Sequence, residues 1–130
     1  MPDTGGSFAV EACEYDRSFH QLEPGGAIIT NVEADHLDYY GSLEAIQEAF
    51  SRFVDLVEDN GLLVLGPEVP EVVETSAGCD VWRLGREIEV DLLGERRGRF
   101  RFRVHGPKWA TPEVVLEVPG EFNVENAALA

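Results

Sequence analysis

Short apolar runs that end in polar residues dominate the first 84 residues of the chain. Such runs are typical of the strands of a parallel sheet, which are covered on both faces and carry polar residues at their carboxyl ends. Four segments fit this description: 8–13, 27–32, 62–66 and 79–84. We therefore predict an α/β fold for residues 1–84, with a parallel sheet and flanking helices.

Between two of these runs the apolar residues change to helical spacing. From Leu43 to Val57, apolar residues recur every three or four positions, and Ser42 can cap the start of the helix. Asn60 and Gly61 are expected to end it, because both residues favour the left-handed conformation that follows a helix. Shorter helical segments are expected near 17–22 and over 69–75.

The pattern changes to strict alternation after residue 85. Segments 87–93, 98–105 and 114–118 alternate apolar and polar residues, with a turn at 94–97 between the first two. This predicts a small antiparallel addition to the parallel sheet over 85–118, and 119–130 reads as the start of a helix. In the second strand we expect Arg99, Arg101 and Arg103 in water, paired with acids of the first strand (Glu87, Glu89 and Asp91), and Phe100, Phe102 and Val104 in the core.

The net charge of the chain limits the kinds of molecule that it can bind. The chain has 130 residues, 44% of them hydrophobic, and a net charge of −15, with only Arg17 and Arg52 as cations before Arg83. The acidic half argues against nucleic acid, although the alternating arginines and phenylalanines could suggest RNA binding. No apolar run is long enough to cross a membrane, so we expect a cytoplasmic protein without a membrane partner. Two cysteines without metal spacing, Cys13 and Cys79, are expected to be free thiols.

Acidic residues and a histidine follow the first two apolar runs. Glu11, with Glu14 and Asp16 nearby, and His36 fall where two adjacent parallel strands would end, so they can meet in one crevice. Carboxylate oxygens suit magnesium, which keeps several waters and bridges to phosphate oxygens. A lone His36 fits a hydrogen-bonded structural residue as well as a ligand. Asp35 fits either an acceptor that orients the His36 ring or a solvated acid.

These two blocks, EACEYDRSF at 11–19 and ITNVEADHLDYY at 29–40, resemble the central, P-loop NTPase-like ATPase domain of the Mur ligases. The resemblance implies that Glu11 and His36 are catalytic residues that assist magnesium ions bound to ATP, and that Asn31 lines the site. It is greatest for the branch of the family that joins L-alanine to UDP-N-acetylmuramate through an acyl phosphate in peptidoglycan synthesis. That branch lacks the modified lysine of several sister ligases, and the lone Lys108 of this chain lies far from the corresponding helix.

The last twelve residues, PGEFNVENAALA, resemble a family segment in which two asparagines contact the adenine of ATP. The corresponding residues here are Asn123 and Asn126, although residues three apart also share a helix face as capping and surface residues. Phe122 stands where the alanine-adding branch has a histidine, which is a departure from its pattern.

No glycine-rich loop ending in Lys-Ser or Lys-Thr occurs in the chain. By resemblance, we expect residues 1–130 to be an incomplete central ATP-binding domain, without the amino-terminal UDP-binding domain and the carboxyl-terminal domain, and inactive alone. Three alternatives stay open: another Mur-type amino-acid or peptide ligase, a small metal-binding hydrolase built on Glu11, Asp35 and His36, and a catalytically silent interaction domain.

Overall fold

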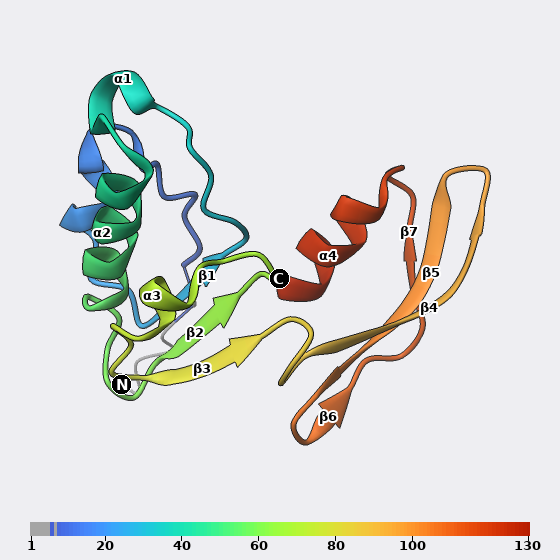
Figure 1. Cartoon of the computed structure of the whole chain (residues 1–130). Coiled ribbons are helices and arrows are strands. Elements are labelled where there is room, and N and C mark those ends of the chain that lie inside the picture. The colour runs from blue at the N-terminus through green and yellow to red at the C-terminus, as the bar shows by residue number, and fades with distance from the viewer. Residues whose placement is uncertain (1–5, 7) are drawn as a thin grey trace.

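A three-stranded parallel sheet forms the centre of the first half of the protein. The computed structural model describes residue 6 and residues 8–130. Its parallel strands are β1 (Gly26–Ile29), β2 (Leu62–Leu65) and β3 (Asp80–Arg83), and β2 is the middle strand. Gly26 is opposite Leu62, which in turn is opposite Asp80, so the three strands are in register and their carboxyl ends share one edge. The predicted parallel sheet is therefore confirmed (Figure 1).

Helices cover one face of this sheet. They are the 3₁₀ helix η1 (Tyr15–Gln21), α1 (Leu37–Tyr40), α2 (Leu43–Val54) and α3 (Glu71–Glu74). α2 is the longest, and its predicted cap is confirmed, since the Ser42 hydroxyl accepts a hydrogen bond from the Ala45 amide at 3.2 Å. Figure 1 shows α2 beside the sheet with α1 above it and α3 next to β2. None of the described helices has the length and apolar character needed to span a membrane.

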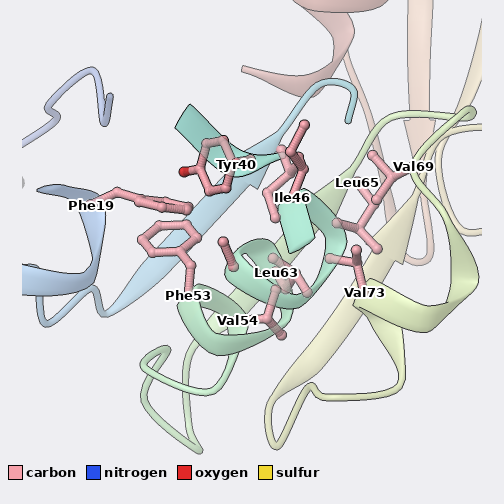
Figure 2. Packing of buried hydrophobic residues seen from close by; sticks show 11 residues of the cluster. Phe19, Tyr40, Ile46, Phe53, Val54, Leu63, Leu65, Val69 and Val73 are labelled. Carbon is pink, nitrogen blue, oxygen red and sulfur yellow. The ribbon is translucent and has the colours of Figure 1, made fainter. Parts of the chain in front are cut away.

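The first core lies between α2 and the sheet. Phe19 of η1 stacks near Phe53 of α2, with ring centroids 5.0 Å apart. Figure 2 shows these two rings and Tyr40 at one end of the cluster, with Leu65, Val69 and Val73 at the other. The buried members of this core are Phe19, Ile29, Tyr40, Ile46, Ala49, Phe53, Val54, Leu63, Leu65, Val69 and Val73. Burial of this apolar surface joins η1, α1 and α3 to the sheet through α2.

An antiparallel sheet and the last helix form a second unit. Its strands are β4 (Glu89–Arg96), β5 (Arg99–Gly106), β6 (Trp109–Ala110) and β7 (Val114–Leu116), followed by α4 (Glu121–Leu129). β5 pairs with all three other strands, and α4 packs on the sheet (Figure 1). Phe100, Phe102 and Val104 are buried as predicted, whereas Arg99, Arg101 and Arg103 are exposed.

Strand β2 connects the two cores. Its side chains alternate, so that Leu63 and Leu65 enter the first core while Leu62 and Val64 contact the second. The second core also holds Phe102 of β5 and apolar residues of α4. The antiparallel unit thus packs against β2 and β3 on the face of the parallel sheet opposite the other helices, and Ile28 of β1 stays 49% exposed. The parallel strands end at Arg83, the antiparallel strands run from Glu89 to Leu116, and α4 begins at Glu121.

The predicted strand 8–13 is wrong. These residues form no regular element, and Phe8 and Val10 are 88% and 58% exposed. An apolar run becomes a strand only where a neighbouring strand supplies hydrogen bonds, and β1 pairs with β2 alone in the described chain. Within 8–13, Ala12 is the residue that packs against the first core.

The predicted end of the long helix is also wrong. The helix α2 ends at Val54 and does not extend to Asn60. The residues that follow it form tight turns. Gly61 is required by close packing: a Cβ atom there would lie 2.3 Å from the Gly25 carbonyl oxygen. The glycine at position 61 is therefore explained by the close approach of two loops and not by a helix cap.

The hairpin differs from the prediction in its turn and its ion pairs. The turn is at Arg97 and Gly98, which both have positive φ, and not over 94–97. A bulge between Leu92 and Gly94 places Gly94 opposite Arg101, so no acidic side chain is available there. Arg101 instead pairs with Glu113 at 2.7 Å and Arg99 with Glu117 at 3.3 Å. Asp91 does lie opposite Arg103 in the strand register, but within the described residues none of the three arginines forms an ion pair with Glu87, Glu89 or Asp91.

Candidate functional site

His36 lies at the start of α1, in the second of the two polar blocks. Its backbone is left-handed, with φ 54° and ψ 36°, and its carbonyl oxygen accepts hydrogen bonds from the amides of Tyr39 and Tyr40 at 2.9 and 3.0 Å. The imidazole Nε2 lies 3.5 Å from Oε1 of Glu14, and the ring of Tyr15 contacts the imidazole edge-on, with centroids 5.2 Å apart. The fold therefore brings His36 to the block that contains Glu11.

The backbone of the first turn of η1, directly after Glu14, is strained. Asp16 and Arg17 have φ values of 55° and 54°, so that three of the four non-glycine residues with positive φ in the described chain lie in the two polar blocks. Such conformations cost roughly 1–3 kcal/mol each and persist where surrounding contacts impose them. Here the Cys13 carbonyl accepts hydrogen bonds from the Phe19 amide at 3.2 Å and the Ser18 hydroxyl at 3.0 Å. Backbone strain of this kind concentrates at functional sites, which supports the candidate site.

Tyr40 connects the two polar blocks, 11–19 and 29–40. Its ring is buried in the first core, its hydroxyl donates a hydrogen bond to the Glu14 carbonyl, and the Arg17 guanidinium lies over its ring, 5.6 Å from the centroid. Burial raises the pKa of the Tyr40 hydroxyl, and the positive charge of Arg17 opposes this rise. The hydroxyl therefore stays protonated at neutral pH and acts as a hydrogen-bond donor.

Glu11 is exposed and makes no ion pair within the described residues. It lies three positions before Glu14, the acid that contacts His36. No group of three or more histidine, cysteine or acidic side chains is assembled for a metal in the part of the chain that the structure describes. The donor set still fits a hard cation, because magnesium takes few protein carboxylates and completes its shell with water and phosphate oxygens.

Neither Asn31 nor Asp35 forms a hydrogen bond with His36. Asn31 donates a hydrogen bond from Nδ2 to Glu33 at 2.7 Å and accepts one from Thr30 at 3.4 Å. Asp35 forms no hydrogen bond with His36, so the carboxylate at the imidazole is Glu14, 22 residues upstream. Sequence reasoning named Glu14 only as a neighbour of Glu11. The signal that singles it out is the left-handed turn after it, which the sequence does not reveal.

Asn123 and Asn126 lie on α4, which packs on the antiparallel sheet and not against α1 or η1 (Figure 1). Asn123 donates from Nδ2 to the Pro119 carbonyl at 2.8 Å, and Asn126 is exposed. A hollow of about 580 Å³ lies beside α4, lined by its Glu121, Val124 and Glu125, by Pro67 and by the start of β4. Neither asparagine lines it.

The other histidines take no part in this site. His20 is hydrogen-bonded to the Ala49 carbonyl at 2.7 Å, and His105 pairs with Asp91 at 2.8 Å on the antiparallel sheet. A zinc site needs three or four ligands at one point, usually histidines and cysteines. The described residues do not assemble one, so the structure gives no support to the hydrolase alternative.

The fold joins a parallel α/β sheet to an antiparallel unit, and it brings the two polar blocks into contact through His36 and Glu14. The chain belongs to the Mur ligase middle domain family, whose model matches residues 1–130.

Individual relatives agree with this assignment. The UDP-N-acetylmuramate–L-alanine ligase of Parabacteroides distasonis is 34% identical over 134 residues, which cover 100% of this chain and 29% of the relative. The solved UDP-N-acetylmuramate:L-alanyl-γ-D-glutamyl-meso-diaminopimelate ligase of Neisseria meningitides has the same fold, with a TM-score of 0.69 at 24% identity, over 85% of this chain and 35% of that one. A solved complex of FPGS with AMPPCP matches with a TM-score of 0.69 at 20% identity, over 83% and 28% of the two chains. The chain thus spans about a third or less of the proteins that it resembles.

Proposed function

We propose that residues 1–130 are part of the central domain of an ATP-dependent ligase that joins L-alanine to UDP-N-acetylmuramate in peptidoglycan synthesis. The observation that carries this proposal is the family match over the whole chain. The choice of L-alanine is supported by the name of the P. distasonis relative and by the absence of a lysine in the helix after His36. Such a ligase works in the cytoplasm, where ATP and the nucleotide-linked sugar are made.

In the proposed reaction, the lactyl carboxylate of UDP-N-acetylmuramate attacks the terminal phosphate of ATP, and ADP leaves as the acyl phosphate forms. The amine of L-alanine then attacks the resulting acyl phosphate and releases phosphate. Magnesium, when bound, neutralises the charge that develops on the transferred phosphoryl group. Glu11 and His36 are the proposed protein groups for magnesium, Glu14 orients the His36 ring, and Asn31 lines the crevice. Asn123 and Asn126 are proposed to contact the adenine.

We further propose that the 130 residues have no ligase or ATPase activity by themselves. Phosphate binding in such enzymes depends on a glycine-rich loop with a lysine, and this stretch of sequence contains none. Loss of preorganised charge stabilisation of this kind commonly costs about 3–4 kcal/mol in the transition state. Release of phosphate by the purified 130-residue chain, dependent on L-alanine and UDP-N-acetylmuramate, would contradict this part of the proposal.

The test of the whole proposal uses the complete ligase that contains these residues. It is incubated with ATP, magnesium and UDP-N-acetylmuramate, and with L-alanine, glycine, L-serine or D-glutamate in parallel reactions. We expect ADP and phosphate in equal amounts, a product heavier by one alanine residue, and the highest kcat/KM for L-alanine. Activity with UDP-N-acetylmuramoyl peptides but not with UDP-N-acetylmuramate would assign the chain to a sister ligase. Nucleotide-independent hydrolysis would refute the ligase assignment.

A further inference from the structure

Arg17 is a cation that neither the fold nor the proposed magnesium site accounts for. It lies in the strained first turn of η1, in the polar block that also contains Glu11. Its backbone is left-handed, with φ 54°, and its amide donates to the Glu14 carbonyl at 3.1 Å. Asp16 and Arg17 are two consecutive non-glycine residues with left-handed backbone. This turn determines the direction in which the Arg17 side chain extends from the backbone.

The Arg17 guanidinium is held by an aromatic ring and not by an acid. Its Cζ lies over the ring of Tyr40, 5.6 Å from the centroid, a geometry in which the ring face attracts the cation. Tyr40 itself is fixed, because its ring is buried and its hydroxyl is hydrogen-bonded to the Glu14 carbonyl. Within the described residues the guanidinium N–H groups form no ion pair with a carboxylate, so they are available to a ligand.

The charge pattern makes this arrangement unusual for an acidic protein. Up to Trp82 the chain has only two cations, Arg17 and Arg52. Arg52 forms a surface pair with Glu48 at 3.1 Å, in which both side chains are about 60% exposed. Arg17 is half-buried, and within the described residues no carboxylate lies in ion-pairing distance of it. The neighbouring acid Glu14 is turned to His36 instead.

We propose that Arg17 binds an oxyanion of a substrate beside the Glu11 and His36 site. A stacked guanidinium with free N–H groups binds the two oxygens of a carboxylate or a phosphoryl group in a bidentate manner. Both kinds of ligand present a negatively charged group with two oxygens that accept hydrogen bonds. Its source is either the carboxylate of the acceptor or a phosphate of the nucleotide, an identification that rests on the proposed function.

The first test measures anion binding directly and needs no activity. Inorganic pyrophosphate and, in a second arm, DL-lactate are titrated into the protein while the Nε–H resonances of its arginines are followed by NMR. We expect a saturable shift of the Arg17 resonance with one of the two anions and none for Arg52, whose partner is a surface acid. Equal, non-saturating responses of Arg17 and Arg52 to both anions would overturn the proposal.

The second test uses the complete ligase and three variants. Arg17→Gln removes the charge, Arg17→Lys keeps it without the planar fork, and Arg52→Gln is the matched control. We expect Arg17→Gln to raise the KM for either UDP-N-acetylmuramate or ATP by roughly 10- to 100-fold, with an unchanged melting temperature, and Arg17→Lys to recover part of the loss. A lowered melting temperature with both KM values unchanged would mean that Arg17 is structural. An inactive wild-type ligase with a saturable Arg17 shift would refute the proposed function and leave the oxyanion site standing.

Discussion

The guanidinium of Arg83 donates hydrogen bonds from Nη2 and Nε to the carboxylate of Glu74, at 2.7 and 3.0 Å. Arg83 is the last residue of β3 and is only 7% exposed. Its Nη1 donates to the carbonyls of Gly66 and Val69, at 3.2 and 2.8 Å, in the loop that follows β2. One buried arginine therefore connects α3, β3 and this loop at the carboxyl edge of the parallel sheet.

Arg83→Met should destabilise the fold by about 3 kcal/mol. The substitution keeps an apolar stem but leaves the loop carbonyls without their donor and removes one of the two arginines that neutralise Glu74. The free energy of unfolding from urea titrations measures the effect. Arg52→Met, at an exposed pair, is the control and should stay within about 0.5 kcal/mol of the wild type. Equal effects of the two substitutions would show that the Arg83 contacts contribute little.

The Glu74 carboxylate should contribute stability that is lost in acid. Burial raises the pKa of Glu74, but hydrogen bonds from Arg86 and Arg83 outweigh burial and hold the pKa below its usual value. A carboxyl with a lowered folded-state pKa stabilises the fold above its unfolded pKa, about 4.3, and loses that contribution as the pH falls through the folded value. The difference in unfolding free energy between wild type and Glu74→Gln should thus be largest near pH 7 and shrink below about pH 4.5. Glu48→Gln controls for the loss of one carboxylate, and a difference for Glu74→Gln that stays constant down to pH 3 would contradict the prediction.

Gly66→Ala should disturb the place where β1 leads into the Asn31 segment. A Cβ atom at residue 66 would lie 1.8 Å from the Thr30 carbonyl oxygen, so one of the two backbones has to move. Overpacking of this kind typically costs about 1–3 kcal/mol. Gly25→Ala is the matched control, because its nearest neighbour, a Glu58 carboxylate oxygen, lies 4.0 Å away. Thermal melts of both variants decide the matter, and a melting temperature for Gly66→Ala equal to that of Gly25→Ala would contradict the close approach.

The parts of the fold that depend on local pattern were predictable from the sequence. Ser42 and the helical spacing after it place the start of α2, and the alternation around Phe102 places β5 with the correct face inward. The parallel strands β2 and β3 were equally evident as apolar runs. In each case the local propensity and the tertiary packing agree, which is the condition for a sequence pattern to predict structure.

Features that depend on distant contacts were not predictable. The run 8–13 has the composition of a strand but finds no partner, and the two-residue strand β6 is defined only by its pairing with β5. At the candidate site, the two polar blocks were evident, but the contact of His36 with Glu14 and the stacking of Arg17 on Tyr40 depend on left-handed residues at 16, 17 and 36. A glycine in a sequence indicates that left-handed backbone is possible, whereas an aspartate, arginine or histidine gives no such indication.

The most direct test of the account asks whether Glu11 and His36 serve magnesium in the complete ligase. Glu11→Gln keeps the size of the side chain, and His36→Asn keeps a residue that tolerates the left-handed backbone at position 36. Glu23→Gln, at an exposed acid, is the control. The ligase rate is measured against magnesium concentration, beside a thermal melt of each variant. Because both contacts should strengthen as charge moves during phosphoryl transfer, we predict a fall in kcat of roughly 100-fold with a raised magnesium requirement and an unchanged melting temperature. Near-normal kcat at saturating magnesium with a lowered melting temperature would show instead that the two residues are structural.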